Sequence, residues 1–400
     1  MSAAFEAARQ CFLAGLAAQQ AGQLVQAETQ YRQSLALLPG RASTLTNLGA
    51  TLVQAGRPSE ALPLLQQALQ AEPGNGDAWA QHGLALVALQ RDEEALQAFG
   101  QAVCTGQVTP ATWYEQARCL ARLGRLDAAL ASCEQALTLS PRVADGWALK
   151  GGLLKDMGRG SEAVPALHRA IALGGDAAMC GYLLASLQGG AAPPQPPPGY
   201  VQGLFDGYAA QFDEHLQRLH YRAPEVLVQG LPPRPQLWNS ALDLGCGTGR
   251  CGVALRGLTQ QLTGVDLSAG MLQQAQARGL YDTLQRADIT AFLQASQQRF
   301  DLVIAADVFI YLGDLEAVFA AVFRALAPDG CFCFSVEAAD DAVDFELRRS
   351  SRYAQSARYV QRLAQQHGLL IWQQQAQPLR EDQRQPVAGL FYWLTPRRAY

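Results

Sequence analysis

The sequence predicts two domains of different class, an all-α repeat array followed by an α/β domain with a mostly parallel sheet. Three observations support this prediction. The first half superimposes on itself when it is shifted by about 34 residues, a period typical of helical repeats. The second half alternates apolar, strand-like runs with amphipathic helical stretches. A proline-rich segment, 188–199, separates the two patterns.

The repeats are visible as aligned columns. The first column contains small residues (Gly15, Gly49, Gly83, Ala117 and Gly151). The second contains only alanine (Ala27, Ala61, Ala95, Ala129 and Ala163). The third contains mostly larger residues (Tyr31, Leu65, Phe99, Cys133 and Leu167). Small residues let two helix backbones touch, and the larger residues fill the space between them. Pro39, Pro73 and Pro141 end three units, because proline has no N–H with which to continue a helix.

These columns resemble tetratricopeptide repeats, in which each unit is a helix–turn–helix. Five units run from about residue 8 to 175, and a further apolar helix over 176–187 would cover the open end. The resemblance therefore assigns 1–187 to a tetratricopeptide repeat domain.

A tetratricopeptide array presents a concave binding surface and carries no chemistry. The usual repeat geometry lines this groove with Arg9, Phe12, Tyr114, Arg118 and Lys155. Some arrays clamp a C-terminal carboxylate with matched polar residues. Here Asn47 stands at one such position but Leu13 at the equivalent one, so that clamp is not predicted. The expected partner is a protein or peptide, and the alternative is a packing or homodimerisation role.

The segment 188–199, QGGAAPPQPPPG, interrupts every periodicity. Proline fixes φ and disfavours helix, which predicts a polyproline II spacer between the domains. A proline-rich ligand for a partner domain is the alternative.

The sequence pattern of the second half predicts a sheet that helices cover on both faces. Its strand-like runs include ALDLG, LTGVD, DLVIAAD and FSVE, and they alternate with helical stretches. Continuous apolar strands of this kind form parallel sheets, and ligands bind outside their carboxyl ends. The runs LLIWQQQAQ and VAGLFYWLTP, separated by polar residues, predict a hairpin.

The stretch ALDLGCGTGR, 241–250, ends a strand with a carboxylate and three spaced glycines. A dinucleotide site has the pattern G-x-G-x-x-G, whereas here the third glycine, Gly249, comes one place early. Asp243 would repel a pyrophosphate and attract the cationic sulfonium and ammonium groups of S-adenosylmethionine. The sequence therefore predicts S-adenosylmethionine rather than a nicotinamide or flavin cofactor.

This D-x-G-x-G-x-G series resembles the first motif of the class I, Rossmann-like S-adenosylmethionine-dependent methyltransferases, and the likeness covers 200–400. The resemblance implies a mostly parallel seven-stranded sheet whose C-terminal hairpin forms an antiparallel edge. The resemblance implies that Asp266 accepts the ribose hydroxyls, with Leu267 beside it and Ser268 as the N-cap of the next helix. It also implies that Asp288 meets the adenine amino group and Ile289 the adenine face. The other residues expected at the cofactor are Tyr208, Arg222, Asp243, Gly245, Cys246, Gly247, Gly249 and Asp307.

The expected reaction is an in-line transfer of a methyl group, which leaves S-adenosylhomocysteine. Proximity and orientation supply most of the catalysis, and a general base helps only if the acceptor loses a proton. By position, the candidate catalytic residues are His215, Asp307, Tyr311 and Glu337. No cluster of metal ligands is visible, so no metal is expected.

The joined order of repeats, linker and methyltransferase resembles bacterial tetratricopeptide-fused methyltransferases. A DNA substrate is not predicted, because the chain lacks the D/N-P-P-Y/F tetrapeptide and has a net charge of −4. No apolar stretch is long enough to span a membrane, and the N-terminus MSAAFEAARQ does not read as a signal peptide. Nine cysteines without a CxxC pair are typical of the cytoplasm.

Three functions remain open at this point. The first is methyl transfer to an O or N acceptor, with the repeats recruiting a protein, peptide or carrier-bound substrate. The second is methylation of a small metabolite, with the repeats serving assembly. The third is a non-catalytic interaction protein, which the intact glycines and Asp266 disfavour.

Overall fold

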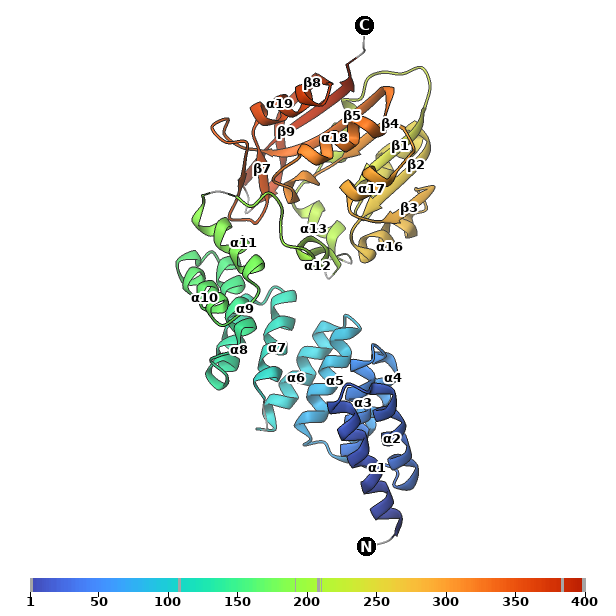
Figure 1. Ribbon diagram of the computed structural model, residues 1–400, viewed down its shortest axis with the longest axis vertical. Helices are drawn as coiled ribbons and strands as arrows, with labels where there is room; N and C mark the ends of the chain where they lie inside the picture. Colours follow the sequence, from blue (N-terminus) through green and yellow to red (C-terminus); the bar gives the residue numbers. More distant parts are fainter. Residues whose placement is uncertain are drawn as a thin grey trace. The chain divides into compact units, whose positions relative to one another are not determined.

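A computed structural model describes residues 3–106, 109–190, 192–206, 209, 211–382 and 385–397. The chain forms two compact units, Met1–Cys180 and Gly181–Tyr400. Figure 1 shows helices alone in the first unit and a sheet flanked by helices in the second.

The helices of the first unit pack in consecutive pairs. Their bounds are α1 (Ala3–Gln20), α2 (Leu24–Leu37), α3 (Ala42–Gln54), α4 (Pro58–Ala71), α5 (Gly76–Ala88), α6 (Asp92–Cys104), α7 (Pro110–Arg122), α8 (Leu126–Leu139), α9 (Ala144–Asp156) and α10 (Gly160–Ala172). The pairs from α1–α2 to α9–α10 are the five predicted helix–turn–helix units. The next helix, α11 (Ala177–Gln188), spans the boundary between the two units.

The glycine column is where the paired helices come closest. A Cβ added at Gly83 would lie 2.6 Å from the ring of Phe99. The same overlap occurs between Gly15 and Tyr31, Gly49 and Leu65, and Gly151 and Leu167. In the fourth repeat Ala117 replaces the glycine and Cys133 the large residue, and both are fully buried. The added methyl group is therefore matched by a smaller partner, as the close packing of protein interiors requires.

Replacing Gly83 by alanine should destabilise the first unit, because the new Cβ overlaps the Phe99 ring. We expect a loss of about 1–3 kcal/mol in the free energy of unfolding. Gly100, on α6, has no atom within 4 Å of its would-be Cβ. Its replacement by alanine should stabilise the same unit by about 0.5–1 kcal/mol, because alanine favours helix. Urea unfolding followed by circular dichroism measures both, and two shifts of the same sign would contradict this account.

The sheet of the second unit is mostly parallel. Its strands are β1 (Trp238–Leu244), β2 (Thr259–Asp266), β3 (Thr283–Arg286), β4 (Phe300–Ala305), β5 (Leu326–Ala338), β6 (Phe345–Leu347), β7 (Tyr353–Gln355), β8 (Leu369–Asp382) and β9 (Gln385–Pro396). The order is β3-β2-β1-β4-β5-β7-β6, and β9 pairs antiparallel with both β5 and β8. The predicted fold class and C-terminal hairpin are confirmed. The predicted count of seven strands is wrong, because β6 and β7 are three-residue strands, too short for a hydrophobic period.

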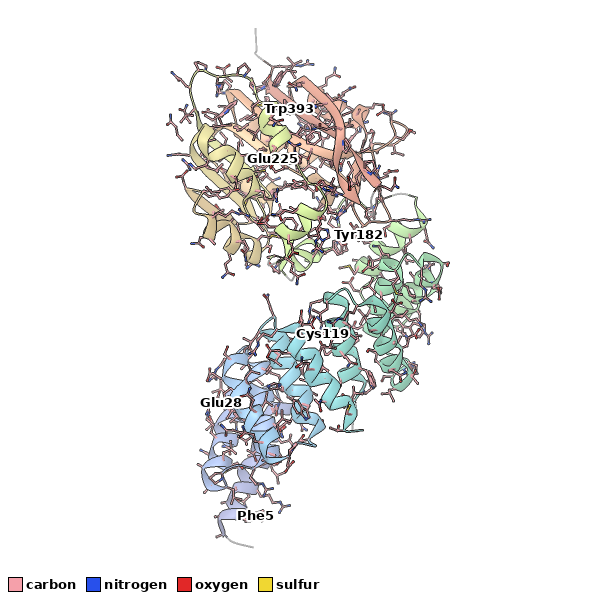
Figure 2. All side chains as sticks on the ribbon, turned by 180° about the vertical axis from the view of Figure 1, so that it is seen from behind. Phe5, Glu28, Cys119, Tyr182, Glu225 and Trp393 are labelled. Atoms are coloured by element: carbon pink, nitrogen blue, oxygen red, sulfur yellow. The ribbon has the colours of Figure 1, made fainter. Side chains whose placement is uncertain are left out.

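Helices cover both faces of this sheet, as predicted. They are α12 (Tyr200–Asp206), α13 (Phe212–Arg218), α14 (Ala223–Gln229), α15 (Arg250–Leu255), α16 (Ala269–Arg278), α17 (Ile289–Ala295), α18 (Glu316–Ala325) and α19 (Ala357–Gln366). In β4, Val303 packs into a core with α17, α18 and α19, and the next residue, Ile304, into a second core with α13, α14 and α15. The second core includes Trp393, whose indole N–H donates to the carbonyl oxygen of Leu227 in α14 (2.9 Å) (Figure 2).

The proline-rich segment is anchored to the second unit. We call residues 193–199 the proline strap. The carbonyl oxygen of Pro194 accepts the backbone N–H groups of Gly313 and Asp314, each at 3.0 Å. The carbonyl oxygen of Pro193 accepts the hydroxyl of Tyr353 (2.9 Å). The strap thus follows the loop after β4 rather than extending into solvent.

The middle of α11 is anchored beside the strap. The Tyr182 hydroxyl donates to the carbonyl oxygen of Ser351 (2.8 Å). Its ring packs with Tyr353 and Leu347 in one buried cluster, and its centroid lies 5.1 Å from that of Tyr200. Both ends of the strap are therefore held by tyrosines.

Candidate active site

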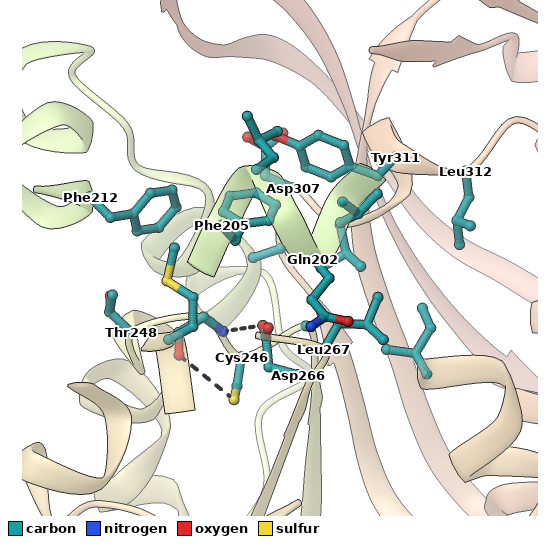
Figure 3. A pocket seen from close by; sticks show the side chains of 18 of the residues that line it. Gln202, Phe205, Phe212, Cys246, Thr248, Asp266, Leu267, Asp307, Tyr311 and Leu312 are labelled. Atoms are coloured by element: carbon teal, nitrogen blue, oxygen red, sulfur yellow. Dashed lines mark hydrogen bonds between the residues drawn. The ribbon is translucent and has the colours of Figure 1, made fainter. Parts of the chain in front are cut away.

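A cavity of about 590 Å³ lies at the carboxyl ends of β1, β2 and β4. Its size falls within the range of small-molecule sites in proteins. The strap from Gln195 to Gly199 lines it together with α12, α13 and the loops after these strands. Ten of the predicted site residues also line it, namely His215, Gly245, Cys246, Gly247, Asp266, Leu267, Asp288, Ile289, Asp307 and Tyr311. Figure 3 shows several of these side chains around the cavity.

The glycine turn after β1 has a backbone that favours glycine. Gly245, Gly247 and Gly249 have φ values of 65°, 53° and 89°, in the left-handed region. A Cβ at Gly245 would lie 2.7 Å from Val308, whereas at Gly247 the nearest atom would be 3.9 Å away, on Phe212. The backbone at Gly247 therefore leaves room for a ligand to approach closely.

Asp243 lies beneath this turn and does not line the cavity. It is 1% exposed, and its Oδ2 accepts the hydroxyl of Tyr281 (2.6 Å). Its Oδ1 has no hydrogen-bond partner among the residues that the structure describes. Burial raises the pKa of this carboxyl to about 7. The sequence pattern placed Asp243 facing the cofactor, but its side chain does not line the cavity and lies next to Cys251.

Tyr281 is a supporting residue that the sequence did not reveal. Its hydroxyl accepts the backbone N–H of Gly252 (3.1 Å) as well as donating to Asp243. A Cβ at Gly252 or Gly264 would lie 2.7 or 2.8 Å from the Tyr281 side chain. A single tyrosine in a loop belongs to no motif, so nothing in the sequence marked it.

The raised pKa of Asp243 predicts a pH dependence of stability. Between about pH 4 and 7 the folded state binds this proton more tightly than the unfolded state, so its contribution to stability falls as pH rises. Replacing Asp243 by asparagine should remove a decline on the order of 4 kcal/mol across this window. Urea unfolding of both proteins at pH 4.5 and 7.5, roughly the two ends of this window, measures the difference. Parallel losses of stability in the two proteins would contradict the assignment.

Asp266, at the end of β2, is held by the backbone. Its Oδ2 accepts the N–H of Gly247 (2.9 Å) (Figure 3). Its Oδ1 accepts the N–H of Ser268 (2.8 Å). Each oxygen keeps a lone pair for a further donor. Burial raises the pKa of this carboxyl despite the two amides. The arrangement offers two oriented acceptors at the cavity wall.

Two side chains at the cavity edge cap helices. The Oγ of Ser268 accepts the N–H of Met271 (3.1 Å) and caps α16, as predicted. Asp288 accepts the N–H of Ala291 (2.9 Å) and caps α17. Because β3 ends at Arg286, Asp288 begins this helix instead of ending a strand.

Arginines bind both Asp307, which lines the cavity, and Glu337, which does not. The Nη1 of Arg380, on β8, lies 2.9 and 2.8 Å from the two carboxylate oxygens of Asp307. Arg380 is 3% exposed and also donates to Glu337. Arg348 approaches Glu337 at 3.1 Å. Asp307 itself has a φ of 59°, a strained value for a residue other than glycine. Both carboxylates are thus engaged in ion pairs, which makes them poor proton acceptors.

Tyr311 and Arg352 also line the cavity. The Arg352 guanidinium lies beside the Tyr311 phenol and favours its ionised form. Burial raises the pKa of Tyr311 above its ordinary value, so the phenol stays protonated at neutral pH. The ring of Phe205, on α12, packs edge-on against Tyr311 with centroids 5.2 Å apart. Arg352 and Arg380 were not predicted, because both lie far along the chain from any motif.

Several predicted site residues lie away from the cavity. Arg222 is exposed at the start of α14, while its neighbour Tyr221 lines the cavity. Glu337 is buried against the two arginines, and Gly249 begins α15. We therefore no longer place Arg222, Gly249 or Glu337 in contact with a bound ligand. Tyr208 lies outside the described residues.

Comparison with known protein families recognises both halves of the chain. Residues 241–330 match a methyltransferase domain. Residues 6–73, 52–111 and 110–143 match tetratricopeptide repeats. The chain thus carries tetratricopeptide repeats and a C-terminal methyltransferase domain, and both recognitions are confirmed.

Curated relatives resemble the second half. A malonyl-[acyl-carrier protein] O-methyltransferase of Enterobacter lignolyticus is 33% identical over 152 residues, 38% of this chain and 58% of the relative. The human methyltransferase-like protein 27 is 46% identical over 88 residues, 20% of this chain and 35% of the relative. The chain spans less than two thirds of the length of these relatives.

Solved structures resemble parts of the chain. A MamA protein covers 42% of this chain and 92% of its own, with 21% identity and a TM-score of 0.38. A DhpI complex with SAH covers 50% of this chain and 95% of its own, with 21% identity and a TM-score of 0.37.

Proposed function

We propose that this chain, which joins tetratricopeptide repeats to a methyltransferase domain, transfers a methyl group from S-adenosylmethionine to an O or N acceptor. The observation that carries the proposal is the cavity in which the glycine turn and Asp266 meet. The donor supplies an activated methyl group when bound. The chain's own residues would bind it, orient it and present the acceptor in line.

The residues of the cavity fit this cofactor. Gly247 leaves open backbone for close approach, and the lone pairs left on Asp266 suit two neighbouring ribose hydroxyls. Asp288 and Ile289 line the wall where an adenine ring would follow.

The repeats suit recruitment of the acceptor. Tetratricopeptide arrays bind proteins and peptides on their concave surface. The malonyl-[acyl-carrier protein] O-methyltransferases among the relatives are named for an acceptor carried on a protein. We therefore propose that the acceptor of this chain is itself a protein or peptide, or is borne by a carrier.

The setting we propose is the cytoplasm. The cysteines are free thiols, which suits a reducing compartment. Within the part of the chain that the structure describes, no helix has the length and apolar character needed to cross a membrane. No group of three or more potential metal ligands lies together among the same residues, so we propose no metal.

Calorimetry with S-adenosylhomocysteine and with NAD tests the cofactor. The proposal predicts binding of the first and none of the second. Transfer of a labelled methyl group into a bacterial cell extract, measured against extract without the protein, then tests the activity. Tight binding of NAD, or no transfer by a protein that binds S-adenosylhomocysteine, would defeat the proposal.

A further inference from the structure

We infer that Tyr311 and Arg352 form the subsite for the methyl acceptor and that this subsite takes a carboxylate. The inference rests on the proposed methyl transfer and names the acceptor class. It is based on the position of the two side chains, on their chemistry, and on the ion pairs that Asp307 and Glu337 make with Arg380.

The topology of the sheet separates two groups of cavity residues. The strand order reverses between β1 and β4, and such a switch point is where ligands bind in open α/β sheets. Gly247 and Asp266 follow β1 and β2, on one side of it. Tyr311 follows β4, and Arg352 precedes β7, which pairs with the end of β5 on the other side. Since the first group suits the donor, the second faces the remaining half of the same cavity.

The chemistry of this pair favours an anion. A guanidinium presents several N–H donors in a plane that matches a carboxylate, and it repels a protonated amine. The Tyr311 phenol, protonated at neutral pH, adds an O–H donor beside the guanidinium. An anionic acceptor would therefore be held beside Phe205 and Leu312, which also line the cavity.

The ion pairs of the nearby acids also favour a carboxylate acceptor. A neutral hydroxyl or an ammonium acceptor must lose a proton, but Asp307 and Glu337 are both bound to Arg380. A carboxylate has already lost its proton at neutral pH. Its oxygen lone pair forms the C–O bond to the methyl carbon as the C–S bond of the sulfonium donor breaks, and that bonding pair stays on sulfur. The products are a methyl ester and a neutral thioether, and no proton moves.

The test uses the full chain with S-adenosylmethionine labelled in its methyl group and desalted bacterial cell extract as acceptor source. Methyl esters release labelled methanol in mild alkali, whereas N-methyl groups and methyl ethers do not. Wild-type protein should therefore add label that alkali releases. Arg352→Gln should lower this label about tenfold or more, as expected for the loss of a charge-assisted hydrogen bond. Arg352→Lys, which keeps the charge, should recover part of it.

Two controls separate this inference from the proposed function. Arg358→Gln removes an exposed arginine of α19 that does not line the cavity, and it should leave the label unchanged. Calorimetry should give all these variants the wild-type affinity for S-adenosylhomocysteine. A loss of that affinity in Arg352→Gln would overturn the inference, because Arg352 would then hold the cofactor. Label that resists alkali would show that the acceptor is not a carboxylate, without contradicting methyl transfer. His215, which lines the cavity, would then again be a candidate general base. Absence of any added label would overturn the proposed function itself.

Discussion

Replacing Arg380 by glutamine is expected to lower the free energy of unfolding of the second unit by about 3–5 kcal/mol. The variant leaves Asp307 and Glu337 buried without their shared guanidinium. Removing one partner of a buried ion pair costs more than the pair contributes, because the remaining charge stays desolvated. Hydrogen exchange of the amides in β5 and β9 reports the stability of this unit separately from that of the repeats.

Two further variants show whether unpaired charge causes the loss of stability in Arg380→Gln. Arg348→Gln removes an arginine whose side chain is 32% exposed, so it should cost far less. Adding Asp307→Asn and Glu337→Gln to Arg380→Gln removes both charges and should recover much of the loss. Failure of this recovery would mean that Arg380 acts through packing rather than charge.

Replacing Asp266 by alanine is expected to weaken S-adenosylhomocysteine binding roughly 100-fold, since two charge-assisted hydrogen bonds to the ribose are lost. Calorimetry measures the change directly. Asp266 also holds the amides of Gly247 and Ser268, so a distorted turn could weaken binding too.

A cofactor analogue without the two ribose hydroxyls separates the two causes. In a double-mutant cycle the analogue should bind wild-type protein more weakly than S-adenosylhomocysteine does, and Asp266→Ala should bind both alike. Equal affinity of wild-type protein for both compounds would remove Asp266 from the ribose contact.

The sequence predicted the parts of the molecule that repeat or that follow local rules. The columns through Gly83 and Phe99 identified the repeats, because each unit meets the same steric requirement. The strand runs and the glycine turn gave the sheet and one half of the cavity, because left-handed backbone favours glycine.

The other half of the cavity depends on tertiary packing. Arg380 reaches Asp307 from 73 positions along the chain, on a strand placed by its pairing with β9. The sequence could place Asp307 and Glu337 at strand ends, but it could not show that an arginine binds both. For the same reason it presented Glu337 as an available base, whereas the structure buries it.

The anchoring of the proline strap changes how a truncated protein should be made. Cutting the chain at residue 190 would keep the strap but discard Tyr182, whose ring and hydroxyl hold the neighbouring tyrosine cluster. If such a fragment lost activity, the cause could be a displaced strap at the cavity and not the absence of the repeats. A fragment starting at Gly181 keeps both Tyr182 and the strap, so it is the better test of recruitment by the repeats.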